Sequence, residues 1–167
     1  MLISQEYLKQ QHELHKNGDY GTSSGKWAKM ICELANANAV TSMLDYGCGH
    51  GFLKKSLQGA NISEYDPCIK GKDSPPTPSE LVVCTDVLEH IEPDCLDNVL
   101  DHLQSLTMRC GFFVIATRPA KKILADGRNA HLIQQSHEWW LPKIFLRWKL
   151  RAFRDFGGCF MLIVEKK

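Results

Sequence analysis

No stretch of the 167-residue sequence stays apolar over the roughly 18 residues that a membrane-spanning helix needs. The N-terminal segment, MLISQEYLKQQHELHK, is polar and lacks the apolar core of a signal peptide. The seven cysteines include no Cys-x-x-Cys pair, and several have apolar neighbours, namely Cys84, Cys110 and Cys159. We therefore expect reduced, buried thiols in a cytoplasmic protein that does not contact a membrane.

Arginine is absent from residues 1–108, and acidic residues are scarce in residues 109–167. The first segment has 8 Lys against 15 Asp and Glu, a net charge of −7. The second has 12 Lys and Arg against 4 acids, a net charge of +8. The simpler interpretation is a solvated surface on which the two segments form salt bridges. The alternative is a basic face that receives an anionic substrate, with nucleic acid as one candidate.

Strand and helix patterns alternate along the chain, and its length suits a single domain over residues 1–167. Strands are expected near 41–45, 61–65, 81–85 and 111–116, helices near 5–16, 26–37, 51–58, 96–106 and 136–145, and a final hairpin at 149–155 and 159–165. This order predicts an α/β fold with a Rossmann-like, mostly parallel sheet, helices on both faces and a C-terminal antiparallel hairpin.

The stretch from Met43 to Gly51, MLDYGCGHG, is the most informative motif. It puts an acid at the end of an apolar strand, followed by three glycines at alternate positions. Glycines between a strand and a helix let a ligand approach the main chain, as in nucleotide-binding turns. A dinucleotide fingerprint needs glycine where Phe52 stands, and a P-loop needs a Lys-Ser/Thr pair that does not follow here. The motif therefore argues against NAD and against a P-loop nucleotide.

LDYGCGHG resembles the first motif of class I S-adenosylmethionine (SAM)-dependent methyltransferases. TDVLEHI, at residues 85–91, resembles the motif after the fourth strand of that family. With the closing hairpin, the resemblance covers about residues 20–167. One departure is the segment 67–80, which is too short for the strand and helix that the family places there. We expect that third edge strand and its helix to be abbreviated.

The resemblance implies a SAM-binding crevice at the carboxyl ends of the strands. Asp66 would accept hydrogen bonds from the ribose hydroxyls, and Asp86 would lie beneath the sulfonium and take part in catalysis. Tyr20 belongs to a loop, within the N-terminal helical segment 1–40, that related enzymes place over the cofactor; an ordinary connection between helices is the alternative. The cofactor-binding set expected from the resemblance is Tyr20, Asp45, Gly47, Cys48, Gly49, Asp66, Asp86 and Val87.

The substrate side should come from the loop and helix at residues 117–148, which follow the last parallel strand. His131 is the candidate general base, since an unperturbed imidazole titrates near neutral pH. Trp139 could stack on a substrate, although packing in the core explains it equally well. The substrate-binding residues expected here are Arg118, Arg128, His131 and Trp139.

A metal ion is not expected. Asp86, Glu89 and His90 stand close in sequence, but no further cluster has ligand spacing, and His90 suits the start of the following helix. His12 and His15 lack the His-Glu-x-x-His spacing of zinc proteases.

The sequence thus predicts a SAM-dependent methyltransferase that transfers a methyl group to an O, N or C nucleophile of a small-molecule acceptor. Methylation of nucleic acid through the basic C-terminal half remains an alternative. Two further alternative functions are that of a SAM-binding protein without catalytic activity and that of a SAM-cleaving enzyme. The sequence determines neither the acceptor nor the oligomeric state.

Overall fold

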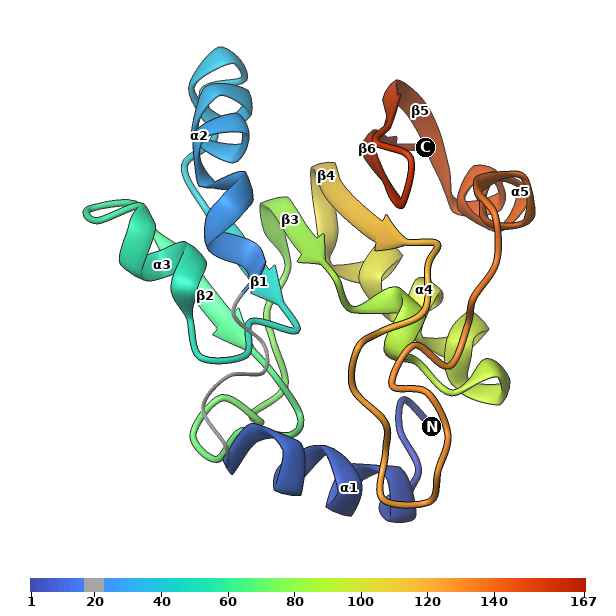
Figure 1. Cartoon of the computed structure of the whole chain (residues 1–167). Helices are drawn as coiled ribbons and strands as arrows, with labels where there is room; N and C mark the ends of the chain where they lie inside the picture. The colour runs from blue at the N-terminus through green and yellow to red at the C-terminus, as the bar shows by residue number, and fades with distance from the viewer. Residues whose placement is uncertain (17–22) are drawn as a thin grey trace.

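A computed structural model describes residues 1–16 and 23–167, which form one six-stranded sheet with helices around it (Figure 1). The strand order is β2-β1-β3-β4-β6-β5, in which β2, β1, β3 and β4 are parallel and β6 runs antiparallel to both β4 and β5. The strands are β1 (Met43–Tyr46), β2 (Ile62–Tyr65), β3 (Ser79–Thr85), β4 (Thr107–Ala116), β5 (Trp148–Asp155) and β6 (Cys159–Lys166). The helices are α1 (Gln5–Lys16), α2 (Ala28–Ala37), α3 (Phe52–Ser56), α4 (Leu96–Leu106) and α5 (His137–Arg147), with 3-10 turns η1 (Ser23–Trp27), η2 (Leu88–His90) and η3 (Pro93–Cys95). The Rossmann-like sheet and the closing hairpin confirm the expected fold class.

The core consists of two apolar layers, one on each face of the sheet. Successive side chains of a strand point to opposite faces. Val82 and Cys84 of β3 therefore pack with α4 and α5, whereas Leu81 and Val83 pack with α2 and α3. This division explains why β3 reads as a continuous apolar run: both of its faces are covered.

The connection between β2 and β3 contains neither a strand nor a helix. Residues 66–78 form turns, bends and irregular chain before β3 begins at Ser79. The expectation of an abbreviated third unit is therefore confirmed, and β2 is the edge strand on that side. Lys72 of this connection reaches back to the glycine turn, where its Nζ donates to the Gly49 carbonyl at 3.1 Å.

Helix α1 crosses the edge of the sheet to which the parallel strands point (Figure 1). The Tyr7 hydroxyl donates to the His90 carbonyl at 2.7 Å, and the backbone N–H and hydroxyl of Ser4 both donate to the Glu92 carboxylate. The Tyr7 ring is buried against Leu124 and Ala130 of the loop after β4. These contacts hold α1 over the carboxyl ends of the strands.

Several salt bridges join the acidic N-terminal segment to the basic C-terminal one. Arg147 pairs with Asp97 at 3.0 Å and with Asp101 at 2.6 Å, and Arg109 pairs with Glu80 at 3.5 Å.

None of the described helices is both long and apolar enough to cross a membrane.

Candidate active site

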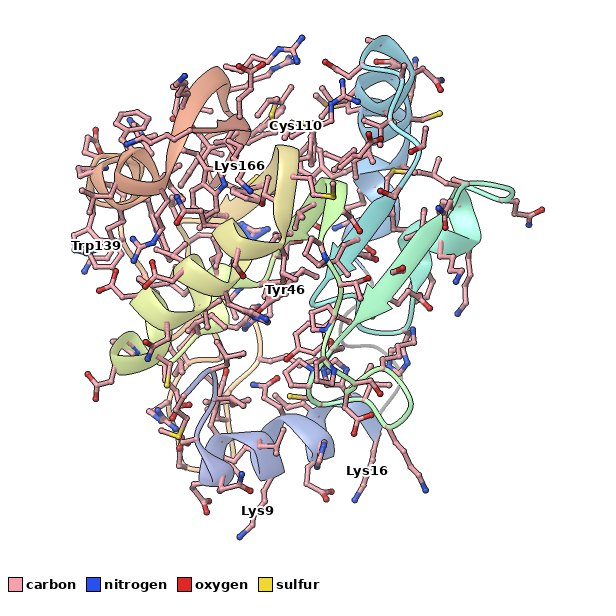
Figure 2. The ribbon with its side chains drawn as sticks, turned by 180° about the vertical axis from the view of Figure 1, so that it is seen from behind. Lys9, Lys16, Tyr46, Cys110, Trp139 and Lys166 are labelled. Carbon is pink, nitrogen blue, oxygen red and sulfur yellow. The ribbon has the colours of Figure 1, made fainter. Side chains whose placement is uncertain are left out.

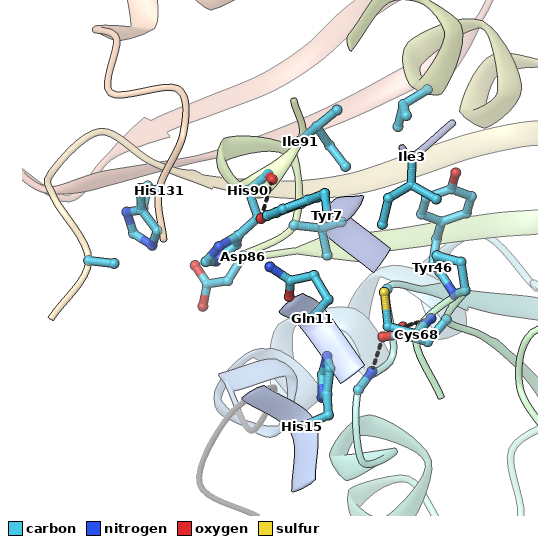
Figure 3. A pocket seen from close by; sticks show the side chains of 18 of the residues that line it. Ile3, Tyr7, Gln11, His15, Tyr46, Cys68, Asp86, His90, Ile91 and His131 are labelled. Carbon is cyan, nitrogen blue, oxygen red and sulfur yellow. Dashed lines mark hydrogen bonds between the residues drawn. The ribbon is translucent and has the colours of Figure 1, made fainter. Parts of the chain in front are cut away.

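A cavity of about 450 Å³ lies between α1 and the carboxyl ends of the parallel strands (Figure 3). Its walls come from the glycine turn after β1, the turn after β2, the segment after β3, the loop after β4 and the inner face of α1. The structure brings these expected site residues together in its lining: Gly47, Gly49, Asp66, Asp86, Val87, Arg118 and His131.

The glycine turn is tied to the end of β2 through its main chain. The N–H groups of Gly47 and Cys48 both donate to the Tyr65 carbonyl, at 2.7 and 3.1 Å. Gly47 has a φ of +73°, a conformation that residues with a Cβ rarely adopt. A Cβ at this position would lie 2.4 Å from Cγ2 of Val87. Glycine is needed here for its backbone conformation and for the close approach of Val87.

Asp66 links the glycine turn to the turn after β2. Its Oδ2 accepts from the Gly49 N–H at 3.0 Å and its Oδ1 accepts from the Cys68 N–H at 2.9 Å. A carboxylate offers about four acceptor positions. Asp66 lines the cavity and keeps acceptor capacity for a ligand while it holds both turns.

Asp45 and Cys48 lie beneath the cavity wall and are not among its lining residues. Each is only 1% exposed. Burial, followed by the nearby Glu64 carboxylate, raises the pKa of Asp45 to about 7. Burial also raises the pKa of the Cys48 thiol, so this thiol stays protonated. Asp45 and Cys48, both expected to bind the cofactor, are therefore buried at the glycine turn and do not line the cavity.

Asp86 ends β3 in an unusual backbone conformation. Its φ is +54°, although Asp is one of the few residues other than glycine that tolerate this region. Its N–H donates to the Val114 carbonyl at 3.0 Å, which anchors this strained residue to β4. Strained residues at strand ends are typical of functional sites. Here the conformation puts Asp86 in the cavity wall beside His90 (Figure 3).

His131 and Arg118 come from the loop after β4. Nδ1 of His131 lies 2.6 Å from the Arg118 carbonyl, which can only accept a hydrogen bond. This contact favours the tautomer with the proton on Nδ1 and the electron pair on Nε2. The backbone N–H of His131 donates to Oδ1 of Asn129 at 2.9 Å. Hydrogen bonds of both the backbone and the imidazole therefore fix the position of His131.

Two further titratable residues, Glu89 and His90, follow Asp86 in the chain, and His90 also lines the cavity. Burial, with Asp86 as the second cause, raises the pKa of Glu89 to about 8. Burial, with His131 as the second cause, lowers the pKa of His90 to about 3. Both groups are therefore held in their neutral forms by burial near neutral pH.

A family model described as a methyltransferase domain matches residues 19–161. The chain belongs to this family of methyltransferase domains. The match includes the glycine turn, Asp66, Asp86 and His131, and the family assignment agrees with the resemblance seen in the sequence.

Solved structures share the fold of this methyltransferase domain at low sequence identity. The DhpI–S-adenosylhomocysteine complex has a TM-score of 0.66 and 14% identity, with 98% of each chain covered. The 1,6-didemethyltoxoflavin N1-methyltransferase of Burkholderia thailandensis has a TM-score of 0.63 and 12% identity over 97% of this chain and 86% of that one. The N-methyltransferase NodS of Bradyrhizobium japonicum WM9 has a TM-score of 0.58 and 14% identity over 84% and 86%. No curated protein matches the chain.

Two residues expected to bind the substrate, Arg128 and Trp139, are not among the residues that line the cavity. Arg128 is exposed and pairs with Asp126 at 2.7 Å, outside the cavity lining. Trp139 is on α5, on the opposite side of the molecule from Lys16 of α1 (Figure 2), and Lys143 lies 4.4 Å from its ring centroid. The structure thus places neither side chain where the substrate-binding prediction needs it. Tyr20 lies outside the described residues.

The cavity contains functional candidates that the sequence did not single out. Tyr7, Gln11 and His15 of α1 line it, and Gln11 is only 5% exposed (Figure 3). These residues recur every four positions, which is the helical spacing of a buried face. That spacing was a usable signal, but it could not show that the face covers the carboxyl edge of the sheet.

Proposed function

We propose that this methyltransferase domain binds SAM and catalyses transfer of its methyl group to a nucleophile of a small anionic acceptor. The observation that carries the proposal is one cavity that unites the glycine turn, Asp66 and Asp86 at the carboxyl edge of a parallel sheet. Open α/β sheets bind their ligands at this edge. Solved neighbours with the same fold include enzymes with bound S-adenosylhomocysteine.

The residues present suit SAM. Asp66 has acceptor capacity for the ribose hydroxyls beyond the two N–H groups that it already binds. Asp86 supplies a carboxylate in the same cavity, which favours a positively charged ligand group. SAM supplies a methyl group on a positively charged sulfur. The chain's own part is to orient the acceptor and exclude water, which lowers the barrier to displacement.

The end of the cavity lined by the loop after β4, where we place the methyl acceptor (the acceptor end), is basic. Arg118, Lys121 and Lys122 line the cavity from the loop after β4. Cavities of a few hundred Å³ are typical of small-molecule sites. A small acceptor with a carboxylate or phosphate group therefore fits this end better than a nucleic acid. The general-base role of His131 stays a prediction, supported by an electron pair on Nε2.

We also propose that residues 1–167 form one domain and that it works in the cytoplasm. All seven cysteines are free, and five of them are buried, which suits a reducing compartment.

The direct test is a calorimetric titration with SAM, followed by mass spectrometry of the products formed with pools of small anionic metabolites. We expect binding of one SAM per chain and formation of S-adenosylhomocysteine with a methylated acceptor. Binding without turnover on any pool would support a non-catalytic module. Other SAM fragments would identify a SAM-cleaving enzyme, and turnover only with RNA or DNA would overturn the small-acceptor assignment.

Asp66→Asn tests the cofactor assignment. An amide has one acceptor oxygen and one NH₂ group, so one of the two backbone N–H groups faces a donor and the ribose hydroxyls lose one of the two oxygens that could accept from them. We expect SAM binding to weaken by about 1–3 kcal/mol in calorimetry. Asp94→Asn makes the same chemical change at an exposed position and should leave the affinity unchanged. Equal SAM affinities for the Asp66 variant and wild type would refute the assignment.

A further inference from the structure

Glu89, His90 and His131 form a compact cluster at the acceptor end of the cavity. Glu89 and His90 lie in η2, directly after the Asp86 turn, whereas His131 comes from the loop after β4, much further along the chain. One ligand atom from each side chain lies within 4.8 Å of the other two. The imidazole rings of His90 and His131 are 4.7 Å apart at their centroids and meet edge to face (Figure 3).

Backbone carbonyls orient both imidazoles in the same way. Nδ1 of His90 lies 2.7 Å from the Ala130 carbonyl, and Nδ1 of His131 lies 2.6 Å from the Arg118 carbonyl. Since a carbonyl oxygen only accepts, each Nδ1 carries the proton and each Nε2 carries an electron pair. Histidines that bind metals are commonly fixed by such a hydrogen bond from the other ring nitrogen.

Glu89 contributes a fully buried carboxyl group, which releases its proton when a metal ion binds. Its Oε1 accepts from the Ala116 N–H at 2.9 Å. Its Oε2 has no hydrogen-bond partner in the part of the chain that the structure describes. A buried oxygen without a partner is costly to maintain, so such an atom points to a ligand that completes its environment.

We propose that Glu89, His90 and His131 bind one divalent transition-metal ion, such as Zn²⁺. Two imidazole nitrogens favour a transition metal over Mg²⁺ or Ca²⁺, which prefer oxygen ligands. Two histidines and one glutamate are a known ligand set for zinc sites that keep an open position. Ligands at roughly 2.0–2.2 Å from zinc are about 3.5 Å apart, so binding draws the side chains closer by about 1 Å.

The metal site has direct access to the cavity. His90 and His131 both line it, together with Asp86, whose negative charge adds to the attraction for a cation. The open position can thus receive an oxygen atom of the acceptor. His131 then acts as a ligand and not as the general base predicted from its residue type. The site deepens the proposed function, but metal binding is measured without SAM and without acceptor.

The test begins with chain freed of metal by chelation. We expect Co²⁺ to bind in a 1:1 ratio and to give visible absorption bands of low-symmetry coordination, and Zn²⁺ to displace it in competition. Metal content after dialysis against Zn²⁺, measured by mass spectrometry, should be one ion per chain. Absence of saturable Co²⁺ and Zn²⁺ binding by wild type would overturn the proposal, whatever the result with SAM.

Three variants locate the site. Glu89→Gln keeps an acceptor for Ala116, and His131→Gln keeps a donor for the Arg118 carbonyl, so both should fold. Each should weaken Co²⁺ binding by at least about 10- to 100-fold, the range found when groups that support a metal site are removed. His137→Gln is the control because His137 also lies near two carboxylates, Glu138 at 3.3 Å and Asp155 at 3.8 Å, but outside the cavity.

Circular dichroism and the melting temperature establish that each variant is folded. Unchanged Co²⁺ affinity in both cluster variants, or loss of binding in His137→Gln instead, would refute the assignment. The SAM titration of the same samples shows whether the proposed cofactor binding survives independently of the metal.

Discussion

Gly47 and Val87 show how the conformation of the glycine turn depends on the absence of a single Cβ. Gly47→Ala would put a Cβ 2.4 Å from Cγ2 of Val87 at a φ of +73°, so it meets both a steric clash and backbone strain. Gly127 has a comparable φ of +85° with no atom within 4 Å of a built Cβ, so Gly127→Ala meets the strain alone. We expect Gly127→Ala to lower the free energy of unfolding by about 1–2 kcal/mol. Gly47→Ala should lower the free energy of unfolding by about 1–3 kcal/mol more than Gly127→Ala does, and it should bind SAM poorly.

Urea unfolding and SAM calorimetry on both alanine variants measure these effects. Equal stability losses and intact SAM binding would show that Val87 moves aside without consequence.

The buried carboxyl of Asp45 makes stability depend on pH. Burial, with Glu64 as the second cause, raises the pKa of Asp45 to about 7, while the unfolded chain releases this proton near 3.8. Between these values the native state binds more protons, so the free energy of unfolding falls as the pH rises from about 4 to 7. Asp45→Asn cannot titrate. The free energy of unfolding of Asp45→Asn should therefore rise relative to that of wild type as the pH rises through this window, by at most about 1.4 kcal/mol per unit of pKa shift.

Urea unfolding of both proteins at pH 5, 6, 7 and 8 measures this difference. Parallel pH curves for the two proteins would show that Asp45 titrates at its ordinary value in the native state.

At the scale of elements, α1 forms one wall of the cavity through a few side-chain contacts. Tyr7→Phe keeps the buried ring and removes the hydrogen bond to the His90 carbonyl, which should cost about 1 kcal/mol. We expect faster amide hydrogen exchange in α1 and weaker SAM binding, with unchanged exchange in the sheet. Glu13→Ala removes only an exposed pair with Lys16 on the same helix and should change neither. Unchanged exchange in the Tyr7 variant would mean that other contacts hold α1.

The missing third strand unit changes how the glycine turn is supported. Lys72 of the short connection donates to the Gly49 carbonyl at 3.1 Å and pairs with Glu64 at 3.2 Å. Asp66 holds the same turn from its other side. The length of the segment predicted that the unit is abbreviated, but only folding back onto the turn brings Lys72 to Gly49.

At the scale of the whole molecule, salt bridges join the two oppositely charged segments of the chain. Arg147 is 8% exposed, and its guanidinium binds Asp97 and Asp101 of α4. Arg147→Lys keeps the charge but not the planar fork, so it should lower the free energy of unfolding by about 1–2 kcal/mol. Both aspartates are largely exposed, and most of this loss comes from the buried guanidinium. Arg151→Lys, at an exposed pair with Glu165, should stay within about 0.5 kcal/mol. Urea unfolding of both variants is the measurement, and equal losses would contradict this ranking.

The order of strands, helices and hairpin, the abbreviated connection and the glycine turn could all be predicted from the sequence. Each depends on neighbouring residues: apolar periodicity, the length of a segment, or glycines at fixed spacing. Local patterns of this kind also indicated Asp66 and Asp86, since acids that follow parallel strands share one edge of the sheet.

Contacts between distant segments could not be predicted in this way. Trp139 and Arg128 matched a substrate-side pattern in sequence, but the folded chain places both away from the cavity. Conversely, α1 covers the cavity although it precedes the first strand by a long stretch of chain. His90 and His131 meet although they are distant in sequence, because β3 and β4 are adjacent and parallel and their following loops emerge at the same edge. The sequence by itself determined the fold class and the cofactor motif, since those depend on local order. Tertiary structure alone decided which side chains share the cavity, because that depends on which strands pair.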